Sequence, residues 1–188
     1  MFLIFAILAG LAALFAILYN RLVRDRNRVD AAWSDIDVQL QRRHDLIPQI
    51  VKSVGQYAAY ERATLEAITV LRAEAMKLTD ATEIDVRGEK EEQLGKEVHR
   101  LIAVAENYPD LKANENFLNL QNELVETENY LQFARRFYNG SVRQFNTRVE
   151  TVPNNIIAGW SGFTQRGFFQ KASDDVAHVP LVRMGKIE

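Results

Sequence analysis

The first twenty residues constrain this chain most, because they contain an unbroken apolar run. The run is FLIFAILAGLAALFAILY, from Phe2 to Tyr19, and it holds no charged or amide side chain. A helix rises about 1.5 Å per residue, so this run is about 27 Å long, close to the hydrocarbon thickness of a bilayer. A secretory signal peptide would need a basic segment before the run and a small-residue cleavage site after it. We therefore expect residues 1–20 to be a retained transmembrane anchor.

Basic residues gather directly after this run and set the expected orientation. No basic side chain precedes the run, whereas four arginines follow it: Arg21, Arg24, Arg26 and Arg28. Basic residues beside a membrane span favour the cytoplasmic side. We expect a single-pass protein of the inner membrane, with its N-terminus outside the cell and its body in the cytoplasm.

The rest of the chain has the composition and periodicity of long helices. Only nine glycines and four prolines interrupt 188 residues, so turn residues are scarce. Between Leu22 and Ile68 apolar residues recur three, four or seven positions apart, the spacing of one helix face. This phase hardly shifts at Pro48, which indicates one kinked helix as far as about Leu78. A proline can also end a helix, and that alternative stays open.

Turn signals divide the remainder into two further helices. Thr82 is placed as an N-cap with Asp85 three positions later, and a charge-rich helix with a mostly solvated face should run from there to about Asn107. The Asn- and Asp-rich segment around Pro109 should form a connection before the last long helix. The expected fold class is all-α: a transmembrane helix, then an up-and-down antiparallel bundle of three to four long helices in residues 21–152.

The last long helix carries two parallel heptad series. The apolar series is Phe117, Leu124, Leu131, Tyr138 and Phe145. The series four residues on is partly polar and consists of Gln121, Glu128, Arg135, Val142 and Val149. Such heptads are typical of helices that pack in coiled-coil fashion. An aromatic-Asn-x-x-Val pattern at Tyr138 and again at Phe145 is interpreted as part of the same periodicity.

Charged residues also fall on the inward stripe of the first helix. Arg43 lies on that stripe, seven positions after Ile36, whereas His44 lies off its centre. We expect Arg43, Glu128 and Arg135 to form inter-helix ion pairs that set the register of the helices, the best-attested use of buried charge in helical assemblies. The alternative is that they lie at the edge of the core and extend their charged ends into water.

Several kinds of chemistry are disfavoured. A net charge of −2 and a pI near 6.0 do not supply the positive surface that nucleic acid requires. Without cysteine there is neither a disulfide nor a thiolate metal site. His44 has Leu40 and Pro48 four positions away, and His99 and His178 stand alone, so we expect no metal site and no cofactor. A carboxylate pair is no signal in a chain with 25 acidic residues.

Residues 153–188 form an aromatic-rich C-terminal tail. Its apolar side chains are Ile156, Ile157, Trp160, Phe163, Phe168 and Phe169. This is too much apolar surface for a free tail, and the glycine-broken segment is too short to span a bilayer. The tail can pack on its own bundle, or it can contact a neighbouring subunit or the membrane interface. Our working hypothesis is an intermolecular contact through Trp160, Phe163, Phe168 and Phe169.

Four long blocks together resemble the LemA family of bacterial membrane proteins. They read RNRVDAAWSDIDVQLQRRHDLIPQIV, YAAYERATLEAI, NYPDLKANENFLNLQNELVETEN and ARRFYNGSVRQFNTRVETVPNNIIAG, and the likeness runs from Tyr19 to about Gly162. The resemblance implies a transmembrane helix, a helical bundle and a small N-terminus outside the cell. One departure is Tyr60, where many relatives carry histidine. The family has no established activity, catalytic residue or cofactor, and relatives in magnetosome membranes suggest a role in organising membranes.

The expected function is that of a membrane-anchored, non-enzymatic scaffold that binds protein or membrane, as a homo-oligomer with protein partners as yet unknown. One alternative is an adaptor or signalling module that captures a specific protein. Another is an enzyme with carboxylates on a cytoplasmic surface, which a deep pocket with perturbed carboxylates would favour.

Overall fold

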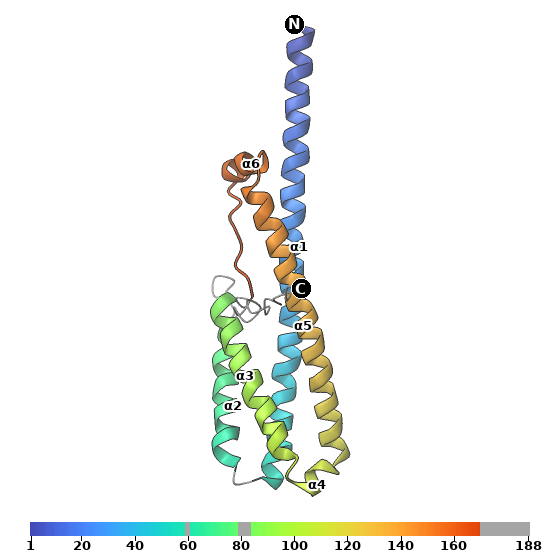
Figure 1. The fold of residues 1–188 in the computed structure, drawn as a ribbon, viewed down its shortest axis with the longest axis vertical. Coiled ribbons are helices and arrows are strands. Elements are labelled where there is room, and N and C mark those ends of the chain that lie inside the picture. The colour runs from blue at the N-terminus through green and yellow to red at the C-terminus, as the bar shows by residue number, and fades with distance from the viewer. Residues whose placement is uncertain (59–60, 79–83, 170–188) are drawn as a thin grey trace, which may run out of the picture.

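A computed structural model describes residues 1–58, 61–78 and 84–169, and every regular element in these ranges is a helix (Figure 1). The all-α expectation is therefore confirmed. The helices are α1 (Phe2–Tyr57), α2 (Arg62–Ala75), α3 (Ile84–Ala105), α4 (Pro109–Lys112), α5 (Glu115–Glu150) and α6 (Asn154–Ser161).

Helix α1 is continuous for 56 residues, which corresponds to a length of about 84 Å. It passes through Pro48 without ending, so the proline is not a boundary. The expected continuation to Leu78 is wrong, because α1 ends at Tyr57 and α2 begins at Arg62. The chain reverses direction between α1 and α2. Val54, before this reversal, and Ile68, after it, are buried in the same core, so the apolar spacing continues across it.

The long helices run up and down the molecule. In Figure 1, α1 descends from the N-terminus, α2 returns upwards, α3 descends and α5 ascends again, with the short α4 at the lower end. Helix α5 packs along α1, and α3 packs along α2. The expected antiparallel bundle of long helices is thus the observed one.

The connection before α5 forms where its residue types indicate. Pro109 occupies the first position of α4, where its missing N–H costs nothing. Asn114 caps α5, since its Oδ1 accepts hydrogen bonds from the backbone N–H groups of Asn116 and Phe117 at 3.0 and 3.2 Å. The N-cap expected at Thr82 and the side chain of Asp85 lie outside the described residues.

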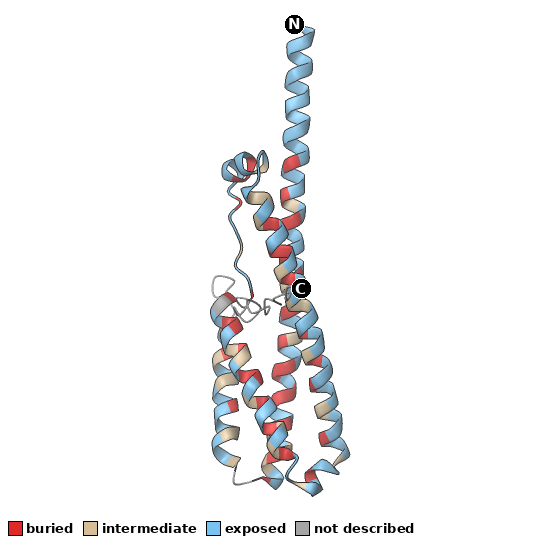
Figure 2. Ribbon diagram, viewed as in Figure 1, coloured by how far each residue is buried: buried red, intermediate tan, exposed pale blue. Residues whose placement is uncertain are grey.

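The interior consists of two apolar cores (Figure 2). The distal core, at the lower end, is built by all four long helices around residues such as Ile50, Ile68, Leu101 and Leu124. The proximal core, nearer the apolar N-terminal segment, includes Leu22, Ile36, Leu131, Tyr138, Val142, Phe145, Ile157, Phe163 and Phe169. Every residue of the apolar heptad series of α5 is buried in one of these two cores.

The described part of the C-terminal tail, as far as Phe169, belongs to the proximal core. Residues 162–169, here called the return segment, run back down the bundle after α6, and Phe163 and Phe169 are buried there. The hypothesis that these two phenylalanines make an intermolecular contact is therefore corrected. Helices α2 and α3 reach only part of the way up α1 (Figure 1), so the α1–α5 pair needs a third layer, which α6 and the return segment supply.

The apolar N-terminal segment stands clear of the bundle. From Met1 to Ile17 every residue is exposed, and burial begins at Leu18 (Figure 2). Among the described helices α1 alone contains a window long and apolar enough to cross a membrane. The exposed apolar side chains fit a lipid environment, since water would penalise them.

Candidate functional site: a buried ionic layer

A layer of ionisable side chains separates the two apolar cores. It consists of Arg43 and His44 of α1, Glu91 of α3 and Glu128 of α5, and is called the ionic layer below. On α1 it falls between Leu40 of the proximal core and Leu46 of the distal core. On α5 it falls between Leu124 of the distal core and Leu131 of the proximal core.

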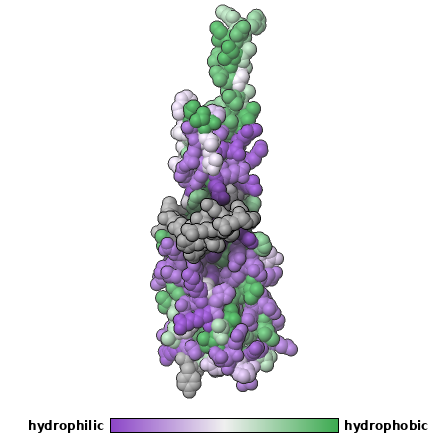
Figure 3. All heavy atoms as spheres, viewed as in Figure 1, coloured by the Kyte–Doolittle hydropathy of each residue, from purple (hydrophilic) through white to green (hydrophobic). Residues whose placement is uncertain are grey.

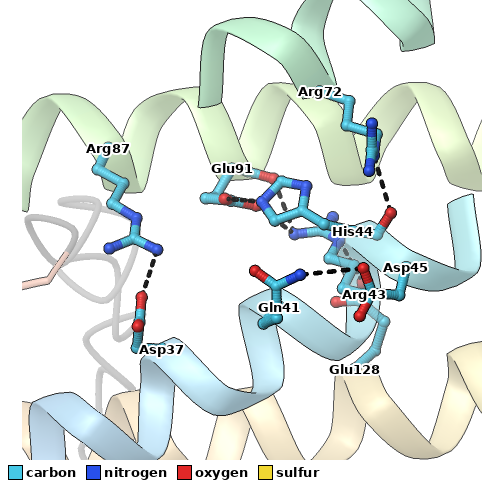
Figure 4. Close-up of polar contacts among 9 residues, drawn as sticks. All are labelled: Asp37, Gln41, Arg43, His44, Asp45, Arg72, Arg87, Glu91 and Glu128. Carbon is cyan, nitrogen blue, oxygen red and sulfur yellow. Dashed lines mark hydrogen bonds and ion pairs between the residues drawn. The ribbon is translucent and has the colours of Figure 1, made fainter. Parts of the chain in front are cut away.

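Arg43 is the centre of this layer and bridges two other helices (Figure 4). Its Nη1 lies 3.2 Å from Glu91 Oε2 and donates to the Glu91 backbone carbonyl at 3.1 Å, while its Nε lies 2.9 Å from Glu128 Oε1. The side chains of Arg43 and Glu91 are only 1% and 0% exposed, and that of Glu128 is 19% exposed. Charges this deep must be paired, because removing an unpaired charge from water is costly.

His44 completes the layer from the neighbouring position on α1. Its Nε2 lies 2.8 Å from Glu91 Oε1, and its side chain is 3% exposed. A carboxylate can only accept, so the Nε2–H tautomer donates this hydrogen bond. Arg72 of α2 adds a further tie by donating from Nε to the His44 carbonyl at 2.8 Å.

His44 lies off the centre of the apolar stripe but is nevertheless buried, for a topological reason. Helix α1 packs against α5 and also faces α3, so its buried arc is wider than its apolar stripe. The view of α3 as mostly solvated is corrected in the same way. Its buried positions follow a spacing of three and four residues, and the series reads Ile84, Arg87, Glu91, Leu94, Val98, Leu101 and Ala105. This spacing could have identified Glu91 as a buried residue. It was overlooked because two residues of the series, Arg87 and Glu91, are charged, so the series does not look apolar.

Gly95 makes room for the arginine. A Cβ at this position would lie 2.4 Å from Arg43 Nη2, well inside contact distance. Gly95 follows Glu91 by four residues on α3, so both lie on the face that meets α1. Glycine therefore leaves room for the guanidinium to approach the α3 backbone closely.

Arg135, the third residue of the expected polar series, lies above the layer on α5. Its guanidinium carbon is 5.1 Å from the centre of the Phe169 ring, a cation–π geometry. Burial lowers the pKa of Arg135, and the nearby charge of Arg43 lowers it further. The structure thus brings Arg43 and Glu128 into direct contact and places Arg135 against the return segment.

Further ion pairs join α3 to its neighbours around the layer. Arg87 lies 2.6 Å from Asp37 of α1, with its guanidinium carbon 5.4 Å from the Trp33 ring centre. Lys90 lies 2.8 Å from Glu74 of α2, and this contact lowers the pKa of the Glu74 carboxyl. The second pair is about 40% exposed, so it contributes little to stability.

Two asparagines of α5 hold the return segment by its backbone. Asn146 donates from Nδ2 to the Arg166 carbonyl and accepts from the Arg166 N–H, both at 2.9 Å. Asn139 makes the same pair with Phe169, at 3.1 and 2.9 Å. These are the asparagines of the aromatic-Asn-x-x-Val pattern, whose aromatic residues Tyr138 and Phe145 are core residues. The pattern is therefore a backbone clamp as well as a heptad repeat.

The remaining candidate residues lie near the end of the apolar segment or on the tail. Arg21, Arg24 and Arg28 are exposed, and Arg26 is half-buried, with its guanidinium carbon 5.5 Å from the Phe163 ring centre. On the tail, Trp160 is 88% exposed and Phe168 is 36% exposed. Trp160 thus lacks the intramolecular packing of Phe163 and Phe169.

The chemistry available to the ionic layer is mutual neutralisation. Arg43, His44 and Glu91 are buried too deeply to meet a substrate in this conformation. Within the part of the chain that the structure describes, no group of three His, Asp or Glu side chains could hold a metal ion. The layer ties α1, α3 and α5 together at one level of the bundle.

Comparison with known proteins gives a family match and several distant relatives. The model of the LemA family matches residues 32–183. Magnetosome protein MamQ 2 of Paramagnetospirillum magneticum is 25% identical over 176 residues, which cover 81% of this chain and 65% of that protein. Protein LemA of Metamycoplasma hominis is 29% identical over 143 residues, which cover 74% of this chain and 63% of that protein. The chain thus spans just under two thirds of the length of these relatives. Since the family match covers most of its residues, the chain belongs to the LemA family.

Proposed function

We propose that this protein is a membrane-anchored, non-enzymatic scaffold that organises membrane or protein assemblies through self-association. The observation that carries the proposal is the continuity of α1, which runs from the exposed apolar segment to the distal end of the bundle as one helix. An anchor and a bundle that share one helix form a rod about 84 Å long, suited to holding other molecules at a fixed place beside a membrane. The similarity to magnetosome proteins named MamQ supports this proposal.

The ionic layer has a place in this function as a register mark. The apolar cores above and below it would tolerate a shift of one helix along another by a turn, whereas Arg43 meets Glu91 and Glu128 in one alignment only. A scaffold must present the same surface in every copy, so a fixed register is useful to it.

The body of the rod is proposed to lie in the cytoplasm. The four arginines Arg21, Arg24, Arg26 and Arg28 follow the apolar segment, and positive charge is retained on the cytoplasmic side. A reporter fused after Glu188 should behave as cytoplasmic, and neutral substitutions of all four arginines should mix the orientations. Alkaline phosphatase activity from a fusion to the native sequence would contradict this orientation.

The test of self-association is the native mass of the full-length protein extracted in detergent and in nanodiscs. A scaffold of this kind should give whole multiples of the 21.5 kDa chain in both media, with the larger species retained on dilution. A monomer in both media, at concentrations at which the protein remains folded, would contradict self-association.

An adaptor that binds one specific protein is the second candidate, and one observation favours it. At the distal end, furthest from the apolar segment, α1 and α5 form a groove rich in amide side chains. Its lining includes Gln49, Gln56, Asn114, Asn116 and Asn119. Amides can both donate and accept, so they suit a peptide backbone. A monomeric body that loses one partner when Gln49 and Asn119 are both replaced by alanine would favour the adaptor.

A further inference from the structure

Helix α6 presents an apolar face that nothing in the described structure covers. The helix buries Ile157 and Ala158 but leaves Ile156 and Trp160 exposed, by 64% and 88%. Ile156 and Trp160 are four residues apart, so they lie on the same face. No charged residue occurs between Val152 and Gln165, so this face has no charge of its own to solvate it.

This helix lies at the level where the apolar segment of α1 ends. Ile157 and Ala158 pack in one core with Leu18 and Leu22 of α1. The Phe163 ring, directly after α6, meets the Tyr19 ring edge to face, with centroids 5.8 Å apart. Tyr19 is the last residue of the apolar run. Figure 1 shows α6 beside α1, just below its free N-terminal stretch, and Figure 3 shows apolar side chains at this upper corner of the bundle.

Charged groups appear at the level of α6 and directly below it. Asp25 of α1 pairs with Arg148 at the end of α5, and Arg166 pairs with Asp30 at 3.3 Å. The change from apolar to charged surface therefore falls at the same level on α1 and on the α5–α6 corner. A membrane surface produces such a level boundary around a protein, because every element must cross it at the same depth.

We propose that the exposed face of α6, formed by Ile156 and Trp160, lies in the interfacial region of the bilayer that α1 crosses. Tryptophan is favoured there, and short amphipathic helices bury their apolar face about 5–10 Å into that boundary. The exposed Arg21 and Arg24 at the same level can meet lipid phosphates. The inference rests on anchorage by α1 but not on self-association. Two points of attachment would fix the tilt and rotation of the bundle, which one helix alone cannot do.

A bilayer explains this face better than a second copy of the chain does. The α6 face lies beside the end of the exposed apolar surface of α1, which runs from Phe2 to Ile17 and already requires lipid. A protein partner would have to cover Trp160 while standing at the membrane surface, and no charged side chain between Val152 and Gln165 would orient it.

The test uses the fluorescence of the full-length protein in nanodiscs that hold one copy each. The chain has two tryptophans, and Trp33 lies fourteen residues beyond Tyr19 on α1, which places it about 21 Å further from the membrane. The Trp33→Phe variant leaves Trp160 as the only tryptophan, and the Trp160→Phe variant leaves Trp33. Lipids with bromine near the headgroup end of the acyl chains should quench Trp160 and spare Trp33. If Trp33→Phe does not fold, the difference between the native chain and Trp160→Phe gives the same quantity.

Matched substitutions separate lipid contact from general exposure. Ile156→Asp should shift the Trp160 emission towards that of tryptophan in water and abolish its quenching by brominated lipid. Val38→Asp is the control, since Val38 is 62% exposed on α1, nearly as much as Ile156, but lies far from the apolar segment. Trp160 quenched by aqueous iodide and not by brominated lipid would overturn the proposal. Protection of Trp160 that appears only in discs with two or more copies would overturn it in favour of a subunit contact. Release of the native protein by alkaline extraction would instead refute the anchorage itself.

Discussion

Replacing Glu91 by glutamine tests the ionic layer most directly. The substitution keeps the shape of the side chain and removes the negative charge between Arg43 and His44, both almost fully buried. At 3.2 Å and an effective dielectric constant of about 20, the attraction between Arg43 and Glu91 is about 5 kcal/mol before desolvation is counted. The amide oxygen of glutamine can still accept a hydrogen bond from Arg43 or from His44. The amide NH2 group, which is a donor, then faces the other of these two donors. Breaking such a buried pair typically costs about 3–5 kcal/mol, and we expect the lower end, about 3 kcal/mol.

The assay is the thermal unfolding of the full-length protein in detergent, followed by circular dichroism. For a chain of this size a loss of about 3 kcal/mol lowers the melting temperature by about 6–12 °C. Glu92→Gln is the matched control, because Glu92 is the next residue, is 42% exposed and pairs with Lys96 within α3. The control should change the unfolding free energy by less than about 1 kcal/mol. Equal melting temperatures for the two variants would refute the reasoning, since the buried charge would then carry no more weight than a surface one.

An apolar version of the layer separates stability from register. Buried ion groups can often be replaced by apolar residues at no cost, or with a gain of about 1–4 kcal/mol. We therefore expect the apolar replacement of all four members to leave the melting temperature unchanged or higher; the substitutions are Arg43→Met, His44→Leu, Glu91→Leu and Glu128→Leu. If the layer fixes the register of the helices, the distribution of distances between spin labels at Val38→Cys and Val125→Cys should become broader in this variant. The chain has no cysteine of its own, so these labels are unambiguous. A single sharp distance, equal to that of the labelled native sequence, would refute the register role.

Three further substitutions address the packing around the layer. Gly95→Ala should destabilise the protein by about 1–3 kcal/mol, because the new methyl group overlaps the Arg43 guanidinium, even though alanine favours a helix. Gly140→Ala should stabilise the protein by up to about 1 kcal/mol, because no atom lies within 4 Å of the added methyl group. Thermal melts of the two variants make the comparison. Leu131→Ala should cost about 2–5 kcal/mol in the same melt, because Leu131 is fully buried, and an unchanged melt would mean that the heptad assignment is wrong. Asn146→Ala should remove two hydrogen bonds to the return segment and lower the free energy of unfolding by about 1–3 kcal/mol. Amide hydrogen exchange should become faster in the return segment but not in the distal core.

The sequence predicts the helices well where a single neighbour determines their buried face. Helix α5 packs along α1 for most of its length, and its apolar heptad is buried at every position from Phe117 to Phe145. The end of α1 was missed, because the sequence has neither proline nor glycine between Tyr57 and Arg62. Apolar residues of both α1 and α2 are buried in the distal core, so the apolar spacing continues from one helix to the next and resembles that of a single longer helix.

The ionic layer could be predicted only in part, because its members depend on which helices become neighbours. Arg43 and Glu128 were found, since each lies on or beside an apolar stripe. Glu91 and His44 were not, because a charged residue on a charged helix has the same local pattern whether it faces water or a partner. Only the approach of α3 to α1 decides between the two, and local periodicity carries no information about that approach.

The C-terminal tail shows how a register can be read once the partner is known. Asn139 and Asn146 are seven residues apart, which is about 10.5 Å along a helix. Their partners Arg166 and Phe169 are three residues apart, which is about 10 Å in an extended chain. The two spacings agree, so both asparagines can bind the same backbone without strain. The aromatic residue before each asparagine then faces the core while the amide faces the return segment. The part of the tail that the structure describes, up to Phe169, is therefore a third layer of the proximal core, and within it the face of α6 formed by Ile156 and Trp160 is exposed for an outside contact.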